Sequence, residues 1–167
     1  MLVVRTAKEY EFEFLQEQRI KAYSQYEQDV PAAHLQVLLK AISADVSTEE
    51  EVEYLVAEWG GEIAGSIVVF PPETDAYDGL TGISTLPEIR MLVVDPSFRK
   101  RGIGKALVEE CLVRTKAKGY PAVGLHTADF MKSAVKLYER MGFKRLPELD
   151  FSPLDDGIVV KAFQYTL

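Results

Sequence analysis

The sequence has few of the features that mark disulfide-stabilised or membrane-embedded proteins. It holds one cysteine in 167 residues, so no disulfide can form within the chain. A reducing compartment is the setting that this predicts. No apolar run approaches the roughly 20 residues that a membrane helix needs, and residues 1–5 are too short and too soon polar for a signal peptide. We therefore expect a soluble, cytoplasmic protein without a membrane partner.

Positive charge is also scarce. The chain has 19 Lys and Arg against 26 Asp and Glu, which gives a formal net charge of -7. General nucleic-acid binding needs a broad basic surface that displaces counterions, so we expect no nucleic-acid partner. The balance favours cationic over anionic substrates. No cluster of His, Cys, Asp and Glu has the spacing of metal ligands, so no metal is expected.

The hydrophobic pattern predicts a single α/β domain over residues 1–167. The length suffices for one substantial core, and neither a repeat nor an internal boundary is evident. Apolar stripes at helical spacing alternate with short apolar runs bounded by Gly and Pro. In the first helical segment, spacing by threes and fours predicts one stripe made of Phe12, Leu15, Arg19, Ile20 and Tyr23. Strands are predicted at 2–5, 52–59, 62–70, 88–95, 122–127, 143–146 and 157–166, and helices within 7–26 and at 31–42, 102–118 and 131–141.

Two segments of this pattern stand out. Gly60-Gly61 joins two predicted strands and tolerates the positive φ angles that tight hairpins need. Residues 71–87 form a loop that is long for a compact domain, and such loops are often functional or mobile.

The strongest chemical signal lies where the strand at 88–95 leads into the next helix. A helix start has backbone N–H groups without an internal partner and a partial positive charge. It therefore binds phosphate where the backbone can be approached closely, which Gly102 and Gly104 permit. Arg99, Lys100 and Arg101 add charge, as does Lys105. The loop lacks the Gly-Lys-Ser/Thr ending of a P-loop and the three glycines of a dinucleotide fingerprint. A basic turn with two convenient glycines remains the alternative interpretation.

Arg99-x-x-Gly102-x-Gly104 resembles the Gln/Arg-x-x-Gly-x-Gly/Ala signature of the GNAT superfamily of N-acetyltransferases. The strand before it, and Ala134-x-x-Leu137-Tyr138-Glu139-x-x-Gly142-Phe143 after it, match the family in order and spacing. The resemblance implies the family fold. This is a central, mixed, mostly antiparallel and twisted sheet of about seven strands, splayed between the fourth and fifth strands and flanked by four helices.

The resemblance also implies acetyl-CoA as co-substrate. The backbone of residues 92–94 is expected to pair with the pantetheine arm like an added strand, and the amides of residues 100–105 to hold the pyrophosphate. Many relatives place an Asn contact with the cofactor where this chain has Met131, so that contact is in doubt. The donor-binding residues implied are Leu92, Val93, Val94, Arg99, Lys100, Arg101, Gly102, Ile103, Gly104 and Lys105.

The resemblance assigns catalysis to Tyr138 and Glu88. A phenol with an ordinary pKa of about 10 is protonated at neutral pH and can donate to the departing thiolate. Glu88, at the start of the central strand, can act as base through water for an amine that is otherwise protonated. Core packing is the alternative role for Tyr138, and a solvated charge is the alternative for Glu88. His126, late in the fifth strand, is a base, a substrate ligand or a packed histidine.

The acceptor is left open by the sequence. Acidic and aromatic residues occupy the segments where this fold binds acceptors, which suits a cationic amine on a small molecule or a peptide. A solvated acidic surface is the alternative interpretation of these residues. Direct transfer in a ternary complex is the leading hypothesis, beside a CoA-binding regulatory domain without turnover and a transferase of another acyl group. A homodimer is possible by resemblance. The residues concerned are Tyr23, Tyr26, Glu27, Asp29, Glu73, Asp75, Tyr77 and Asp78.

Overall fold

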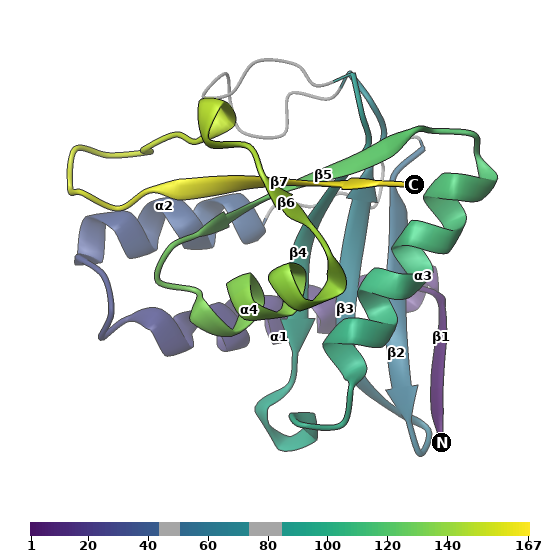
Figure 1. Cartoon of the computed structure of the whole chain (residues 1–167). Helices are drawn as coiled ribbons and strands as arrows, with labels where there is room; N and C mark the ends of the chain where they lie inside the picture. The colour runs from purple at the N-terminus through teal and green to yellow at the C-terminus, as the bar shows by residue number, and fades with distance from the viewer. Residues whose placement is uncertain (44–50, 74–84) are drawn as a thin grey trace. The chain divides into compact units, whose positions relative to one another are not determined.

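The computed structural model describes residues 1–43, 51–73 and 85–167. Two compact units make up the chain: Met1–Val69 with Met91–Glu110, and Phe70–Arg90 with Cys111–Leu167. The strands form one seven-stranded sheet of order β1-β2-β3-β4-β5-β7-β6, with four α-helices α1–α4 in the described ranges (Figure 1). The predicted fold class is confirmed. That residues 1–167 fold as one domain stays a prediction, and most of the predicted 71–87 loop lies outside the described residues.

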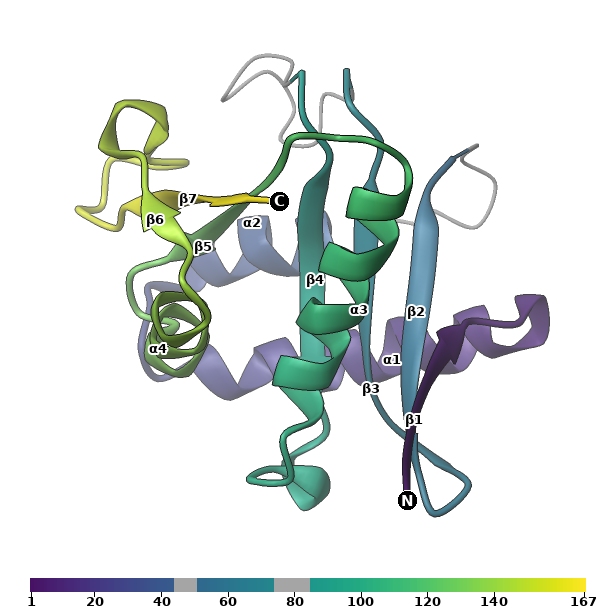
Figure 2. The same ribbon diagram turned by 45° about the vertical axis from the view of Figure 1, so that its right-hand side comes forward.

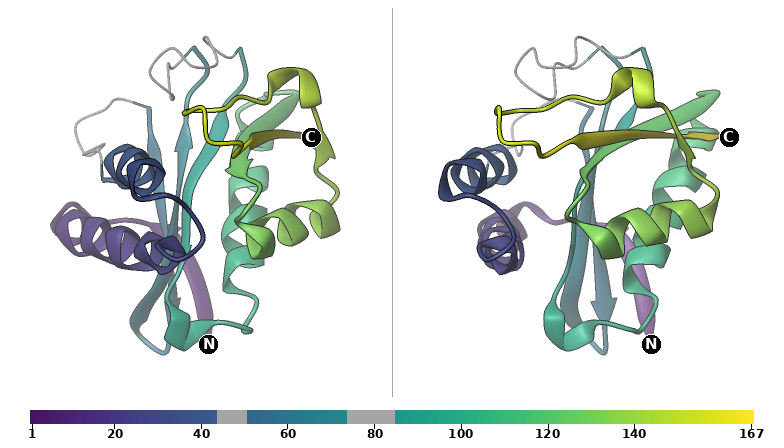
Figure 3. Two further views of the ribbon diagram at one scale, coloured as in Figure 1. Left: turned by 90° about the vertical axis from the view of Figure 1, so that its left-hand side faces the viewer. Right: turned by 60° about the vertical axis from the view of Figure 1, so that its left-hand side comes forward.

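The first unit is built on an antiparallel meander. β1 (Leu2–Thr6) pairs with β2 (Glu53–Trp59), and β2 pairs with β3 (Glu62–Phe70). The hairpin turn is Gly60-Gly61, at φ 60° and 87°, as the sequence predicted. Both angles are positive, which is what a type I′ turn requires. α1 (Phe12–Tyr23) and α2 (Ala32–Ile42) lie side by side on one face of these strands (Figure 3).

Helix α1 buries a different stripe from the predicted one. Leu15 and Arg19 are buried as expected, but Ile20 is 37% exposed, so its predicted inward position was wrong. Gln18 is buried instead, because positions 15, 18, 19 and 22 share one helix face and 20 does not. The amide of Gln18 donates to Ile63 O at 3.3 Å, which satisfies that donor in the core.

The second unit holds the C-terminal strands. β5 (Ala122–Ala128) pairs along its whole length, antiparallel, with β7 (Val160–Thr166), and the short β6 (Lys144–Arg145) pairs with β7 on the other side. Helix α4 (Lys132–Met141) ends at Gly142, whose φ of 95° makes the left-handed cap that the sequence predicted. Figure 2 shows α4 together with β5, β6 and β7. Their aromatic residues form the core described below.

β4 (Glu88–Val94) and α3 (Ile103–Ala117) run from one unit into the other. In the second unit, β4 pairs in parallel with β5 through Glu88↔Gly124 and Ile89↔Leu125. Only these two residue pairs are recorded between β4 and β5, as expected if the two strands diverge beyond them. In the described ranges, no helix is long and apolar enough to cross a membrane.

Candidate active site

The end of β4 is fixed to β3 before the chain turns toward α3. The Asp95 N–H donates to Ala64 O at 2.8 Å. The Asp95 carboxylate accepts from Ser97 N at 2.9 Å and from Ser97 Oγ at 2.6 Å, and so caps the 3-10 helix η3 (Pro96–Phe98). These Ser97 hydrogen bonds lower the pKa of Asp95. The carboxylate therefore holds the first turn of the basic loop.

The 99–105 loop presents a row of free backbone donors. Lys100 has φ 63° and Gly102 has φ 75°, so two residues of the loop adopt the left-handed backbone conformation. The first backbone bond of α3 runs from Ala106 N to Gly102 O at 3.0 Å. Among the described residues, no group accepts a hydrogen bond from the N–H groups of residues 100–105. Such concave runs of amides at a helix start bind phosphate. Phosphate binding by the amides of residues 100–105 stays a prediction.

The charged side chains of this loop are held in different ways. Arg99 Nη2 donates to Gln25 Oε1 at 2.8 Å, in the 3-10 helix η2 (Ser24–Tyr26). The Arg101 guanidinium lies 5.1 Å from the centre of the Trp59 ring and 5.5 Å from that of Phe98. Arg101 is therefore directed at two aromatic rings, although its charge still contributes to the field around the loop.

Lys105 Nζ lies 3.6 Å from Glu109 Oε1, one turn on along α3, and both side chains are more than half exposed. Surface pairs of this kind hold their partners weakly. Lys100 is exposed as well.

The second half of β4 is packed closely against its neighbours in the first unit. Val93 is buried, and Leu92 O accepts a hydrogen bond from Tyr23 OH at 3.2 Å. A Cβ on Gly65 of β3 would lie 2.4 Å from Val93 O, so the two backbones approach each other at this point. Met91 has φ 58°, which breaks the regular extension of the strand. The pairing of residues 92–94 with a pantetheine arm stays a prediction.

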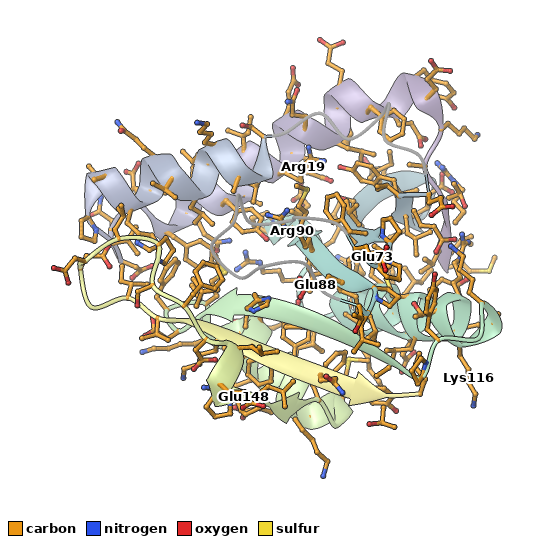
Figure 4. All side chains as sticks on the ribbon, turned by 90° about the horizontal axis from the view of Figure 1, so that it is seen from above. Arg19, Glu73, Glu88, Arg90, Lys116 and Glu148 are labelled. Atoms are coloured by element: carbon orange, nitrogen blue, oxygen red, sulfur yellow. The ribbon has the colours of Figure 1, made fainter. Side chains whose placement is uncertain are left out.

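The second unit brings together two residues that the sequence analysis named separately. Glu88 Oε1 lies 3.2 Å from His126 Nδ1, and the two side chains are 12% and 5% exposed. Glu88 is seen beside β5 in Figure 4. The register Glu88↔Gly124 explains the contact, because residue 126 lies two positions further along β5 on the same face. His126 Nε2 in turn lies 3.2 Å from Leu149 O.

Tyr138 is buried in an aromatic cluster of the second unit. Its ring centre lies 5.5 Å from that of Phe143 and 6.3 Å from that of Phe163. Core packing is thus part of its role, and its catalytic role stays a prediction. Met131 is buried and accepts a hydrogen bond on its sulfur from Thr127 Oγ1 at 3.6 Å. Its side chain therefore belongs to the core.

Of the predicted acceptor residues, Asp75, Tyr77 and Asp78 lie outside the described residues. In the first unit, the rings of Tyr23 and Tyr26 meet edge to face at 6.2 Å. Burial raises the pKa of Tyr26, against the opposing influence of the Arg99 charge.

The sequence analysis did not identify the segment 145–151, which contacts the His126 ring through Leu149 O and the Phe151 ring. The Arg145 guanidinium makes two 2.7 Å bonds to the Asp150 carboxylate, which also accepts from Ala162 N at 2.8 Å. The Arg145 hydrogen bond holds the pKa of Asp150 below its usual value. The Phe151 ring meets the His126 ring edge to face at 5.5 Å. The pairings His126↔Ala162 and Phe151↔Val160 on β7 bring this segment to His126, and no local motif marks it.

The described part of the chain has neither a cluster of metal ligands nor an exposed thiol. It contains no group of three or more His, Cys, Asp and Glu that could hold a metal ion. Cys111 is buried on α3, and its carbonyl accepts a hydrogen bond from Thr115 Oγ1 at 2.6 Å.

Comparisons with known proteins agree with this arrangement. Residues 9–143 match the family model described as "Acetyltransferase (GNAT) family". The chain is 35% identical over 113 residues to N-acetyltransferase family 8 member 2 of Rattus norvegicus, covering 68% of this chain and 48% of that protein. It is 30% identical over 94 residues to the N-acetyltransferase YjgM of Escherichia coli, covering 56% of this chain and 52% of that protein. The chain thus spans about half the length of these relatives.

Two solved structures share the fold. One is the PaiA N-acetyltransferase of Thermoplasma acidophilum in complex with coenzyme A, with a TM-score of 0.70 and 18% identity over 99% of each chain. The other is YncA of Salmonella typhimurium with its cofactor acetyl-CoA. It has a TM-score of 0.67 and 14% identity over 100% of this chain and 94% of that one.

Proposed function

Because the chain belongs to the acetyltransferase (GNAT) family, we propose that it transfers the acetyl group of acetyl-CoA to an amine. The observation that carries the proposal is the 99–105 loop. In this loop, the backbone N–H groups of residues 100–105 donate to no described group. Two residues have left-handed backbone angles, and a 15-residue helix begins there. A pyrophosphate is the anion that such a site fits. That the two structural neighbours were solved with CoA or acetyl-CoA supports this choice of anion.

The donor would be held mainly by backbone groups. The amides of residues 100–105 would bind the pyrophosphate, and Arg99 and Lys100 would add charge at the mouth of the site. The backbone of residues 92–94 would pair with the pantetheine arm. Tyr23, through Leu92 O, and Gly65, through its contact with Val93, support the position of that backbone.

The chemistry proposed is direct attack in a ternary complex. The amine nitrogen forms a bond to the thioester carbonyl carbon, the carbon–sulfur bond breaks, and the sulfur keeps the electron pair. The amine gives up one proton, which Glu88 would accept directly or through water. Tyr138 would supply a proton to the thiolate. Passing the proton from Glu88 back to Tyr138 restores the resting chain. Because the acceptor amine is cationic, it must also lose one proton to solvent before it attacks, so each turnover releases one proton.

The acceptor proposed is a cationic amine on a small molecule or a peptide. The chain carries a net charge of -7. Glu27 and Asp29 follow directly on the paired rings of Tyr23 and Tyr26 in the first unit. Carboxylates beside aromatic faces are a setting that attracts ammonium groups.

Release of free CoA thiol tests the proposal. The protein would be incubated with acetyl-CoA and a panel of amines that includes polyamines, amino acids and short peptides, with succinyl-CoA as a parallel donor. Acetyl-CoA turnover that depends on one class of amine is the expected result. CoA binding without turnover on any acceptor would indicate a regulatory CoA-binding protein, and preference for succinyl-CoA would identify a different acyl transferase.

A further inference from the structure

The contacts of His126 fix where one of its protons lies. A backbone carbonyl can only accept hydrogen bonds, so the Nε2 that lies 3.2 Å from Leu149 O must carry a proton. In the neutral ring, the lone pair then belongs to Nδ1. Nδ1 lies 3.2 Å from a Glu88 carboxylate oxygen, which is also an acceptor, although no hydrogen bond joins the two atoms in this geometry. Two acceptors in a buried contact repel each other unless a second proton lies between them.

We propose that Glu88 and His126 share one proton between Oε1 and Nδ1, and that this pair, rather than Glu88 alone, is the acid–base unit of the enzyme. The inference rests on the acetyl transfer proposed above. In this arrangement Glu88 is the residue that takes the proton of the amine. His126 acts through Glu88 and is a positioning residue, because its Nδ1–H orients the carboxylate and balances its charge.

The step proposed for Glu88 uses its second carboxylate oxygen, which is buried in the free protein and which the amine or a water must reach when the acceptor binds. Glu88 Oε2 is buried and has no hydrogen-bond partner among the described residues. A buried carboxylate oxygen without a donor is costly, and such atoms mark places where a ligand or water completes the site. During transfer an N–H bond of the amine breaks, its electron pair stays on nitrogen, and the proton binds a lone pair of Oε2. Oε1 would keep the shared proton with His126 Nδ1 throughout.

The position of His126 depends on the segment that follows β6. Leu149 ends the 3-10 helix η4 (Pro147–Leu149), and the next residue, Asp150, is tied to Arg145 and to Ala162 N. These bonds hold the Leu149 carbonyl, which in turn selects the Nε2–H form of the ring.

Among the described residues, charged groups from three elements act on the ring or on its partners. They are Glu88 on β4, Asp150 after η4 and, through Asp150, Arg145 on β6. The pKa of Asp150 is lowered mainly by its hydrogen bond with Arg145, and the His126 charge acts in the same direction.

Nitrogen NMR on protein labelled at histidine tests the shared proton without any substrate. The chain has two histidines, so His34 in the first unit serves as an internal reference. At neutral pH we expect both ring nitrogens of His126 to show the signals of protonated nitrogen. In Glu88→Gln the side-chain amide would donate to Nδ1, so Nδ1 should change to an unprotonated signal while His34 keeps its own.

A proton missing from Nε2 of His126 in the parent protein would overturn the proposal, and so would an unchanged Nδ1 in Glu88→Gln. If the His34 signals show that Glu88→Gln does not fold, Glu88→Asp replaces it. Its shorter carboxylate keeps the charge, and it should retain a protonated Nδ1 with a shifted signal. An Nδ1 without a proton in Glu88→Asp also counts against the pair.

Kinetics of two His126 variants test its role in turnover. Asn places an amide N–H near the position of Nδ1, and Gln places one near Nε2. We expect kcat to fall by about 10- to 100-fold in His126→Gln and by less in His126→Asn, with KM for acetyl-CoA changed less than about twofold. Unchanged kcat in His126→Gln would refute the positioning role. The expected NMR signals together with no turnover on any amine would instead refute the proposed function.

Discussion

Gly65 provides the sharpest test of how the donor site is built. A Cβ at this position would lie 2.4 Å from Val93 O and 3.3 Å from Val94 Cα. Carbon–oxygen contacts of this kind settle near 3.3 Å or beyond. Gly65→Ala should therefore push the β4 backbone away by about 1 Å. The residues that move are the ones proposed to pair with the pantetheine arm.

The size of the effect follows from this displacement. Overpacking a buried contact costs about 1–3 kcal/mol, and a shift of about 2–4 °C in Tm accompanies each kcal/mol in a chain of this size. Misplacing a binding group by about 1 Å can cost about 100-fold in function. We expect CoA to bind Gly65→Ala about 10- to 100-fold more weakly, measured by isothermal titration calorimetry, with a lower Tm by differential scanning fluorimetry.

Gly124→Ala is the matched control. It also lies in a strand, but a Cβ there would meet its nearest atoms at 3.6 Å, on Glu88 Oε1, and at 3.7 Å, on Phe163 O. Those are ordinary contacts, so this variant should keep its CoA affinity. It should gain about 0.4–1 kcal/mol of stability, because Ala has less freedom than Gly in the unfolded chain. If Gly65→Ala binds CoA as the parent does and melts at the same temperature, the close approach does not position the site.

Three further variants test the remaining features. Tyr138→Phe should lower kcat by about 10²- to 10⁴-fold, the range for lost acid–base catalysis, and leave CoA affinity unchanged by calorimetry; unchanged turnover would remove Tyr138 from the mechanism. Gly102→Ala, at φ 75°, should cost about 1–2 kcal/mol and weaken CoA binding, whereas equal binding would place the phosphate elsewhere. Because the pKa of Asp150 is lowered in the folded state, its stabilising contribution is present above the ordinary value of about 3.9 and is lost as the pH falls through the folded value. The parent protein should therefore lose more stability than Asp150→Asn when Tm is followed from about pH 5 to pH 3, and parallel curves would contradict this.

The sequence predicted turns and helix ends correctly where a glycine takes a backbone conformation that other residues rarely adopt. Gly60-Gly61 set the hairpin between β2 and β3, and Gly142 set the end of α4, because each occupies a left-handed position. Spacing by threes and fours misplaces Ile20, because one residue beyond the buried Arg19 turns its side chain about 100° around the helix to the exposed side. A polar residue, Gln18, can occupy the buried face once Ile63 O accepts its amide hydrogen.

The same distinction holds for the candidate site. The 99–105 loop was predicted because its donors, glycines and charges are contiguous in the chain. The contact of Glu88 with His126 depends on the register of β4 against β5, and that of Arg145 with Asp150 depends on a turn with no motif. Pairing across strands is decided by the packing of whole faces, which periodicity alone does not specify.

The stacking of Arg101 on Trp59 has a practical consequence. Trp59 is the single tryptophan of the chain, so its fluorescence can be excited selectively and comes from one place, the ring under the guanidinium of the 99–105 loop. Any ligand that draws Arg101 toward its phosphates changes the surroundings of that ring. The fluorescence of Trp59 should therefore report binding at the proposed anion site in a titration without a label.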